Sequence, residues 1–316
     1  MNKIDMHFHS TMSDGKYTTD EVINDAIERK LDFAAITEHD TINTDFPILA
    51  KQNWIDSIEW VEISVLDDKL SHKHLHITSY ATKFSWEIYD VLADTREWKI
   101  NRVYKQVSVL KSNWFNIDYE EFLEFCTEKW FSIENLNSAH ISNYIFQNED
   151  NIKLIEELTW EEMDMWKFIA KCLKEKSEFK HIWWSEVEKY EPTITEIWKI
   201  AKKWWYFLSL AHPNFNFKDD YDLFRFFVEE YADILNGIEI NTLASKKWVE
   251  VILETVKKHN LILTFGSDDH FIRGKNPDTF HGILWYPNPH IPEWVMLENF
   301  KNFLLVTNAT QSIKKV

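Results

Sequence analysis

Two histidine and aspartate motifs near opposite ends of the chain have the spacing of metal ligands. The first, HFHSTMSDG, contains His7 and His9, and the second, GSDDHF, contains Asp268 and His270. Residues two apart in an extended strand project to the same face, so each pair can reach a single cation. Each pair also follows a short apolar run, which is where an α/β fold presents functional side chains. Several divalent cations held in this way suit a hydrolytic enzyme.

The sequence between these motifs adds further candidate ligands. Asp14 lies in the first motif, and His39 lies in TEHD near the end of the next apolar run. Glu62, in SIEWVEIS, is the carboxylate that points the same way as the apolar alternates of its strand. A carboxylate in that position can bridge two cations. His212 closes the strand FLSLA before a proline that fixes the exit turn.

Alternating histidines in SHKHLHITSY offer one more ligand. Only His76 lies well inside the predicted strand, so it is the predicted ligand, with His74 as the alternative. His140 precedes a helical pattern, and we place it beside the substrate rather than on a metal. The remaining candidates lie in polar or loop surroundings and are interpreted as surface histidines: His181, His259, His281 and His290.

The mixture of ligands indicates which metals and which chemistry to expect. Imidazole with carboxylate suits Mn²⁺, Fe²⁺ or Zn²⁺ better than Mg²⁺ or Ca²⁺. Two such ions about 4 Å apart can lower the pKa of a bridging water and hold both the attacking and the leaving oxygen of a displacement. We therefore expect two or three divalent ions, attack by a metal-bridging hydroxide, and catalytic roles for Asp14, Glu62 and Asp268. No Ser-His-Asp or Cys-His constellation occurs in a plausible context.

Alternating strands and helices must position these groups. A capping box at Thr18 and Glu21 predicts a helix to about Lys30, and a second helix is predicted at residues 46–52. The order is typical of an α/β fold with a parallel sheet. Its strands are predicted at residues 4–7, 33–37, 58–64, 74–81, 207–210, 237–240 and 262–265.

A long helical stretch interrupts the alternation. It predicts three segments: an N-terminal barrel part at residues 1–84, a helical insertion at 85–203 and a C-terminal barrel part at 204–316. Basic residues on the first helix of the insertion, Arg96, Lys99 and Arg102, share a face and could bind phosphate, although a solvated helix face explains them as well. Arg273 and Lys275, just past the second motif, are alternative phosphate ligands.

Composition limits the partners. The 316 residues are 45% hydrophobic and carry a formal net charge of −17, which excludes a broad basic surface for long nucleic acid. Cys126 and Cys172 are predicted to be buried apolar residues rather than a disulfide. The first residues lack the pattern of a signal peptide and no run long enough for a membrane span occurs, so we expect a cytoplasmic location. No protein partner is evident.

Tryptophan is unusually common and glycine unusually rare. The chain has 16 Trp and 5 Gly, which together make up about 7% of the residues, the ordinary share of glycine alone. Trp54 and Trp114 follow Asn where helical patterns end, a position that favours glycine, and Trp204 and Trp205 separate a helix from a strand. We hypothesise that many of these residues are glycine in the native protein, from UGA codons that encode glycine. A Trp-rich core or a sugar-stacking surface is the alternative.

The motifs together resemble those of PHP-domain proteins, named for polymerases and histidinol phosphatases. Residues 7–41 look like the opening of that family, and the later segments follow in the family's order: VEIS, HLHITSYA, NSAHISNYI, KKWWYFLSLAHPNF and TFGSDDH. The resemblance covers nearly the whole chain. It implies a distorted (β/α)7 barrel with a trinuclear metal site at the C-terminal ends of its strands. Trp60, before VEIS, and Trp204-Trp205 stand where the family has glycine.

The resemblance also implies how the ligands are shared and what reaction they serve. The first metal would bind His7, His9, Glu62 and Asp268, the second Glu62, His76 and His212, and the third Asp14, His39 and His270. Stand-alone members of this kind hydrolyse nucleoside 3′,5′-bisphosphates or trim short RNA from its 5′ end. Two alternatives stay open: a phosphatase for a small metabolite such as histidinol phosphate, and a non-catalytic metal-binding module.

Overall fold

The computed structural model describes residues 3–70, 73–174, 177–180, 190–270 and 288–307. The chain divides into two compact units, residues 1–93 with 191–316 and residues 94–190. The predicted insertion began at residue 85 and ended at 203. Helix α9, Ile194–Trp204, instead belongs to the first unit, because its buried face (Ile194, Ile197 and Ala201) joins the hydrophobic core of that unit.

In the part of the first unit that the structure describes, seven strands form two sheets. β1 and β2 pair in parallel, and the larger sheet has the order β3-β4-β5-β6-β7. The prediction of an all-parallel sheet is wrong for β4, which runs antiparallel to both β3 and β5. Only residues 67–73 connect β3 to β4, too few for the crossover that parallel neighbours need. The strands are Ile4–Asp5, Phe33–Ala34, Glu59–Leu66, His74–Ala81, Phe207–Leu210, Gly237–Asn241 and Ile262–Gly266.

Single parallel bridges connect the two sheets. Phe8 bridges to Asp269 beyond β7, and His39 bridges to Glu62 within β3. In the described residues, the strands form these two sheets rather than one continuous barrel. The bridges nevertheless bring the ends of β1, β2 and β7 and the middle of β3 to one place, which is where the candidate ligands lie.

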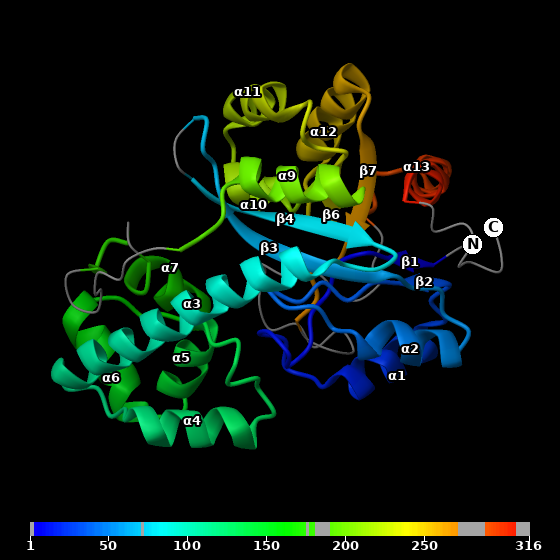
Figure 1. Ribbon diagram of the computed structural model, residues 1–316. Helices are drawn as coiled ribbons and strands as arrows, with labels where there is room; N and C mark the ends of the chain where they lie inside the picture. The colour runs from blue at the N-terminus through cyan, green and yellow to red at the C-terminus, as the bar shows by residue number, and fades with distance from the viewer. Residues whose placement is uncertain (1–2, 71–72, 175–176, 181–189, 271–287, 308–316) are drawn as a thin grey trace. The chain divides into compact units, whose positions relative to one another are not determined.

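Helices cover the larger sheet and fill its core. Figure 1 shows α9, α11 and α12 on one side of β3 and β4, with α1 and α2 on the other. The capping box of α1 is confirmed, because Thr18 accepts from the Glu21 amide while Glu21 accepts from the Thr18 amide. The helices of this unit are Thr19–Arg29 (α1), Asp45–Gln52 (α2), Ile194–Trp204 (α9), Pro213–Phe217 (α10), Tyr221–Tyr231 (α11), Lys246–His259 (α12) and Glu293–Val306 (α13).

The second unit is helical around its own core. It contains most of α3, Trp86–Ser112, followed by α4, Tyr119–Glu128, α5, Ser138–Ile145, α6, Glu149–Thr159, and α7, Met165–Cys172. Both cysteines are free and buried in this core, as predicted. Burial raises the pKa of each thiol to about 12, so neither is a reactive nucleophile at neutral pH. No helix of the described residues is long and apolar enough to cross a membrane.

Five tryptophans occupy a backbone conformation that favours glycine. Each lies at or just past the end of a helix with φ between 59° and 71°, and each side chain is 75–91% exposed. Left-handed backbone costs a bulky residue free energy that glycine does not lose. The predicted conformation at Trp54, Trp114 and Trp205 is thus confirmed, while the recoding itself stays a hypothesis. The five residues are Trp54, Trp114, Trp130, Trp160 and Trp205.

Two other tryptophans do not need glycine's conformation. Trp204 is the last residue of α9 and has helical backbone. Trp60 lies inside β3, is 1% exposed, and packs against Tyr80 with ring centroids 3.8 Å apart. That separation is below the usual range for aromatic pairs, about 4.5–7 Å. The indole N–H of Trp60 is also buried without a hydrogen-bond partner among the described residues, so its site is crowded rather than backbone-strained.

Candidate metal centre

The two ends of the chain meet through backbone hydrogen bonds. The amide of Asp268 donates to the carbonyl of His7 at 2.7 Å, and the amide of His9 donates to the carbonyl of Asp269 at 2.9 Å. Asp5 accepts from the amides of both His7 and Ser267, which ties β1 to the segment after β7. The first and last motifs therefore lie side by side despite more than 250 residues between them.

Four ligand atoms converge on one point. His7 Nε2 lies 3.1 Å from His9 Nε2, 3.0 Å from Glu62 Oε2 and 3.5 Å from Asp268 Oδ1. His9 Nε2 lies 3.3 Å from both carboxylate oxygens. Ligand atoms around a tetrahedral ion with bonds of about 2.1 Å are roughly 3.4 Å apart. These separations therefore fit a divalent cation held by the four residues.

Glu62 faces two groups of histidines with its two oxygens. Its Oε1 lies 2.8 Å from His212 Nε2 and 2.9 Å from His76 Nδ1. Its Oε2 faces His7 and His9, and also lies 3.2 Å from His39 Nδ1. The side chain is fully buried in the middle of β3. This is the geometry that a bridging carboxylate requires.

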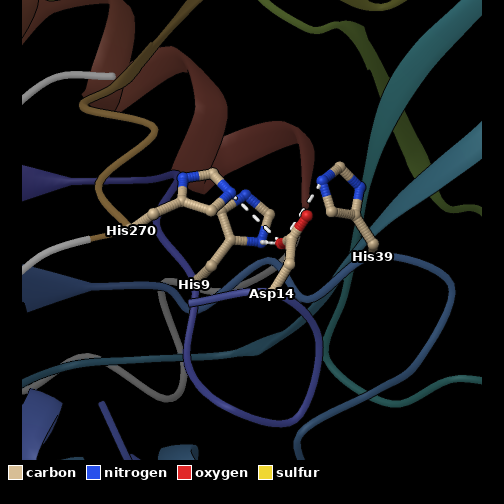
Figure 2. Close-up of side chains that lie close together, drawn as sticks. All are labelled: His9, Asp14, His39 and His270. Carbon is tan, nitrogen blue, oxygen red and sulfur yellow. Dashed lines mark ion pairs between the residues drawn. The ribbon is translucent and has the colours of Figure 1, made fainter. Parts of the chain in front are cut away.

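A third group forms around Asp14 (Figure 2). Its Oδ1 lies 3.2 Å from His270 Nε2 and 3.7 Å from His39 Nε2. His9 Nδ1 is 4.0 Å from the same oxygen, so the two ring nitrogens of His9 face different groups. Figure 2 shows the imidazoles of His9, His39 and His270 surrounding the Asp14 carboxylate. All nine predicted ligands thus lie in one cluster, with donor types and spacings that suit divalent cations.

Buried carboxylates outside this set fix the loops that present the ligands. Glu38 accepts from the amide and hydroxyl of Ser10 and from the hydroxyl of Ser13, and so shapes the turn that leads to Asp14. Asp40 accepts from the amide and hydroxyl of Ser64, both at 2.8 Å. Glu239, on β6, was missed by the sequence analysis. The signal was a single carboxylate between isoleucines in GIEIN, the pattern that identified Glu62.

Burial and charge oppose each other throughout the cluster. Burial alone would lower the pKa of His7, but the charges of Glu239 and Glu62 outweigh it and raise that pKa well above its usual value. Burial alone would raise the pKa of Glu62, yet neighbouring imidazoles, His39 foremost, hold it well below its usual value. For His39 burial dominates and lowers the pKa to about 3. The metal-free cluster therefore balances ionised carboxylates with protonated histidines, positive charge that bound cations would supply instead.

Other predicted residues lie elsewhere. The ring of His74, the alternative ligand, is 47% exposed and pairs with Glu191. Arg96, Arg102 and His140 belong to the second unit, and their roles in substrate binding stay predictions. The described residues do not include Arg273, Lys275, His181 or His281.

No protein-family model matches the chain, and no curated protein matches it. Two solved structures resemble it over nearly their whole length. A proposed metal-dependent phosphoesterase from Bifidobacterium adolescentis has a TM-score of 0.68 at 20% identity, covering 96% of each chain. An amidohydrolase from Chromobacterium violaceum, solved with sulfate and without metal, has a TM-score of 0.70 at 20% identity, covering 94% of this chain and 96% of its own. The chain has their fold.

A third solved structure is a two-domain protein from Bacteroides vulgatus, described as containing a predicted PHP-like metal-dependent phosphoesterase. At a TM-score of 0.42 and 14% identity, covering 85% of this chain and 52% of its own, it aligns too loosely to support the assignment. The fold assignment therefore depends on the first two structures alone.

Proposed function

We propose that this protein is a metal-dependent phosphoesterase of the PHP type. The observation that carries the proposal is Glu62, which directs its two oxygens to different groups of imidazoles at 2.8–3.3 Å. The fold shared with the proposed phosphoesterase from Bifidobacterium adolescentis supports it. A complete (β/α)7 barrel is part of the same proposal, and the two bridges that connect the sheets are consistent with it.

The residues of the cluster have distinct tasks in this reaction. When bound, the divalent ions would activate water and stabilise the charge that develops on phosphate oxygens. His7, His9, Glu62 and Asp268 would hold the inner ion, since His7 and Glu62 are fully buried and His9 and Asp268 nearly so. Among the nine candidate ligands, His76 has the most exposed side chain, at 34%, so the phosphate ester would approach the cluster from the side of His76. Asp14, His39 and His270 would hold another ion beside the inner one.

We propose nucleoside 3′,5′-bisphosphates or the 5′ end of short RNA as substrates. The sequence motifs resemble those of family members that act on them, and the net charge of −17 suits a small substrate held by cations rather than long nucleic acid. The Chromobacterium violaceum protein binds sulfate, a tetrahedral anion similar to phosphate. A small-metabolite phosphate ester and a non-catalytic module are the competing outcomes.

The test is an activity screen of the full chain loaded with Mn²⁺. Nucleoside bisphosphates, 5′-phosphorylated short RNA, histidinol phosphate with other metabolite esters, and simple amides are assayed in parallel. We expect phosphate or nucleotide release from the first two classes only, with a loss of about 10³-fold in Glu62→Gln, which removes the bridging charge. Turnover of metabolite esters alone would favour the small-metabolite phosphatase. No turnover with bound metal confirmed would leave a non-catalytic module.

A further inference from the structure

Glu239 contacts two candidate ligands that both face Glu62, His7 and His212. Its Oε2 lies 2.6 Å from His7 Nδ1, the ring nitrogen that faces away from the other ligands. Its Oε1 accepts from the backbone amide of His212 at 3.2 Å. Both Glu239 and His7 are completely buried, and His212 is 7% exposed. One carboxylate therefore fixes the ring of one ligand and the main chain of another.

The fold leaves room for this contact at Gly266. A Cβ added to Gly266 would lie 2.3 Å from the Cβ of His7 and 3.0 Å from the Oε2 of Glu239. Real Cβ atoms do not approach other atoms so closely, so any side chain at this position would displace the pair. The contact between His7 and Glu239 therefore requires glycine at position 266, the last residue of β7.

The contact fixes the ring nitrogens as metal binding requires. A carboxylate on Nδ1 holds a proton at that nitrogen, so Nε2 keeps its lone pair toward Glu62 and Asp268. Among the described residues, the hydrogen bonds of Glu239 go to His7 and His212 and to no member of the Asp14 group. Its influence is therefore confined to one part of the cluster.

We propose that Glu239 is a positioning residue that determines how tightly the inner ion is held, because it fixes the ring of His7 and the backbone of His212, which both face Glu62. This inference rests on the metal centre of the proposed function, but not on its substrate. Without Glu239, His7 can rotate or take the other tautomer, and His212 loses the acceptor that holds its backbone. Loss of such a partner weakens metal binding by about 10–100-fold.

Metal retention in Glu239→Gln tests the proposal. The full chain is loaded with Mn²⁺, and bound metal is measured by mass spectrometry and by competition with a chromophoric chelator. We expect the Kd of one ion per chain to rise about 10–100-fold while the other ions keep theirs. Raising free Mn²⁺ should restore the activity of the variant, because the substrate-facing residues are unchanged.

Two further variants keep the result interpretable. Asp67→Asn is the matched control, since Asp67 is also a buried carboxylate of the first unit but bonds Tyr231. It should retain every ion. Gly266→Ala displaces the His7–Glu239 pair from the opposite side and should lose the same ion as Glu239→Gln. Unchanged retention in Glu239→Gln, or equal loss in Asp67→Asn, overturns the proposal. Glu239-dependent retention in a wild type that hydrolyses nothing leaves it standing and rejects the phosphoesterase.

Discussion

Left-handed backbone occurs in two regions of this protein with opposite surroundings. In the candidate metal centre, Asp40, His212 and Asp268 have φ of 49°, 27° and 56°, and all are buried. At the helix ends, five tryptophans have similar φ values, and their side chains are exposed. The same strain is thus found in a polar interior and on the surface.

The difference lies in what each strained residue gains. Asp40 accepts two hydrogen bonds from Ser64, His212 donates to Glu239, and Asp268 donates to the carbonyl of His7. Such contacts over-determine the backbone and direct ligands into the cluster. The five tryptophans at the helix ends have side chains that are 75–91% exposed, and none of them is among the candidate ligands, so their left-handed backbone does not direct a ligand into the cluster. In the first region the left-handed backbone positions candidate ligands, and in the second it is the conformation that the glycine hypothesis predicts.

Replacing all five helix-end tryptophans by glycine should give the largest effect on stability. A non-glycine residue in this conformation costs on the order of 1–3 kcal/mol, and the five residues follow five different helices, so we sum the low end of that range over the five sites. We expect the free energy of unfolding to rise by about 5 kcal/mol, measured by urea denaturation. Activity should not change.

The matched control is Trp294→Gly. Trp294 is 67% exposed but lies in the first turn of α13 with helical backbone, so glycine should not stabilise the chain there. Equal stabilisation by this control would show that exposure, rather than backbone conformation, explains the gain. Mass spectrometry of the protein from its own organism provides the direct check, since recoding requires glycine at these positions.

Glycine at Asp268, a left-handed position of the candidate metal centre, should lower activity instead of leaving it unchanged. Asp268→Gly relieves φ in the same way but removes a carboxylate that lies 3.3–3.5 Å from two imidazoles. We expect kcat/KM to fall about 10³-fold, equivalent to about 4 kcal/mol, with loss of bound metal. Trp205→Gly, measured beside it, should keep full activity. Activity of Asp268→Gly within tenfold of wild type would contradict the comparison.

The sequence was sufficient for most elements that hold the site. Strands β4 and β5 have the predicted bounds, and α1 begins at its capping box, because alternation and capping are local signals. The antiparallel direction of β4 was missed, since direction depends on connection length and on neighbours that alternation does not identify. The place of α9 was also missed, because an amphipathic face does not reveal which core it covers.

The convergence of the candidate ligands was predictable because their residue types and strand positions are distinctive. All nine lie in the cluster, and His76 rather than His74 faces Glu62. Glu239 was not predicted, because the isoleucines on either side of it place the carboxylate inside a strand but do not show which residue it contacts. Its function became visible only when folding placed β6 beside His7. The strain at His212 was equally hidden, as φ is set by contacts between distant segments.

Replacing Asp40, which has a left-handed backbone but is not a candidate ligand, should have a smaller effect. Asp40→Ala removes the acceptor of the Ser64 amide and hydroxyl, both buried. We expect the free energy of unfolding to fall by about 2 kcal/mol, because hydrogen bonds to a charged group contribute about 1.5–3 kcal/mol. Ser64→Ala, which removes only the hydroxyl, should cost about 1 kcal/mol. Equal costs for both would place the energy in the hydroxyl alone, and not in the backbone contact that fixes Asp40.

The smallest expected effect is a dependence of Mn²⁺ affinity on pH. Protons compete with cations in the candidate metal centre, but not at the helix ends. Burial alone would lower the pKa of His270, but the charges of Asp14 and Asp268 outweigh it and raise that pKa to about 10. At neutral pH the metal-free ring is therefore protonated, and a cation must displace that proton to bind. Affinity for Mn²⁺ should thus rise with pH, up to about tenfold, or 1.4 kcal/mol, per unit for each proton released.

Calorimetric titration with Mn²⁺ between pH 7 and 9, in buffers with different ionisation enthalpies, measures both the Kd and the protons released. His39, with a pKa of about 3, should release none, so the release comes from the raised imidazoles, His270 among them. Trp205→Gly should leave this pH dependence unchanged, because the helix ends carry no coupled charge. A Kd that is constant over this range would mean that the imidazoles are already neutral, and that the charge balance inferred for the metal-free centre is wrong.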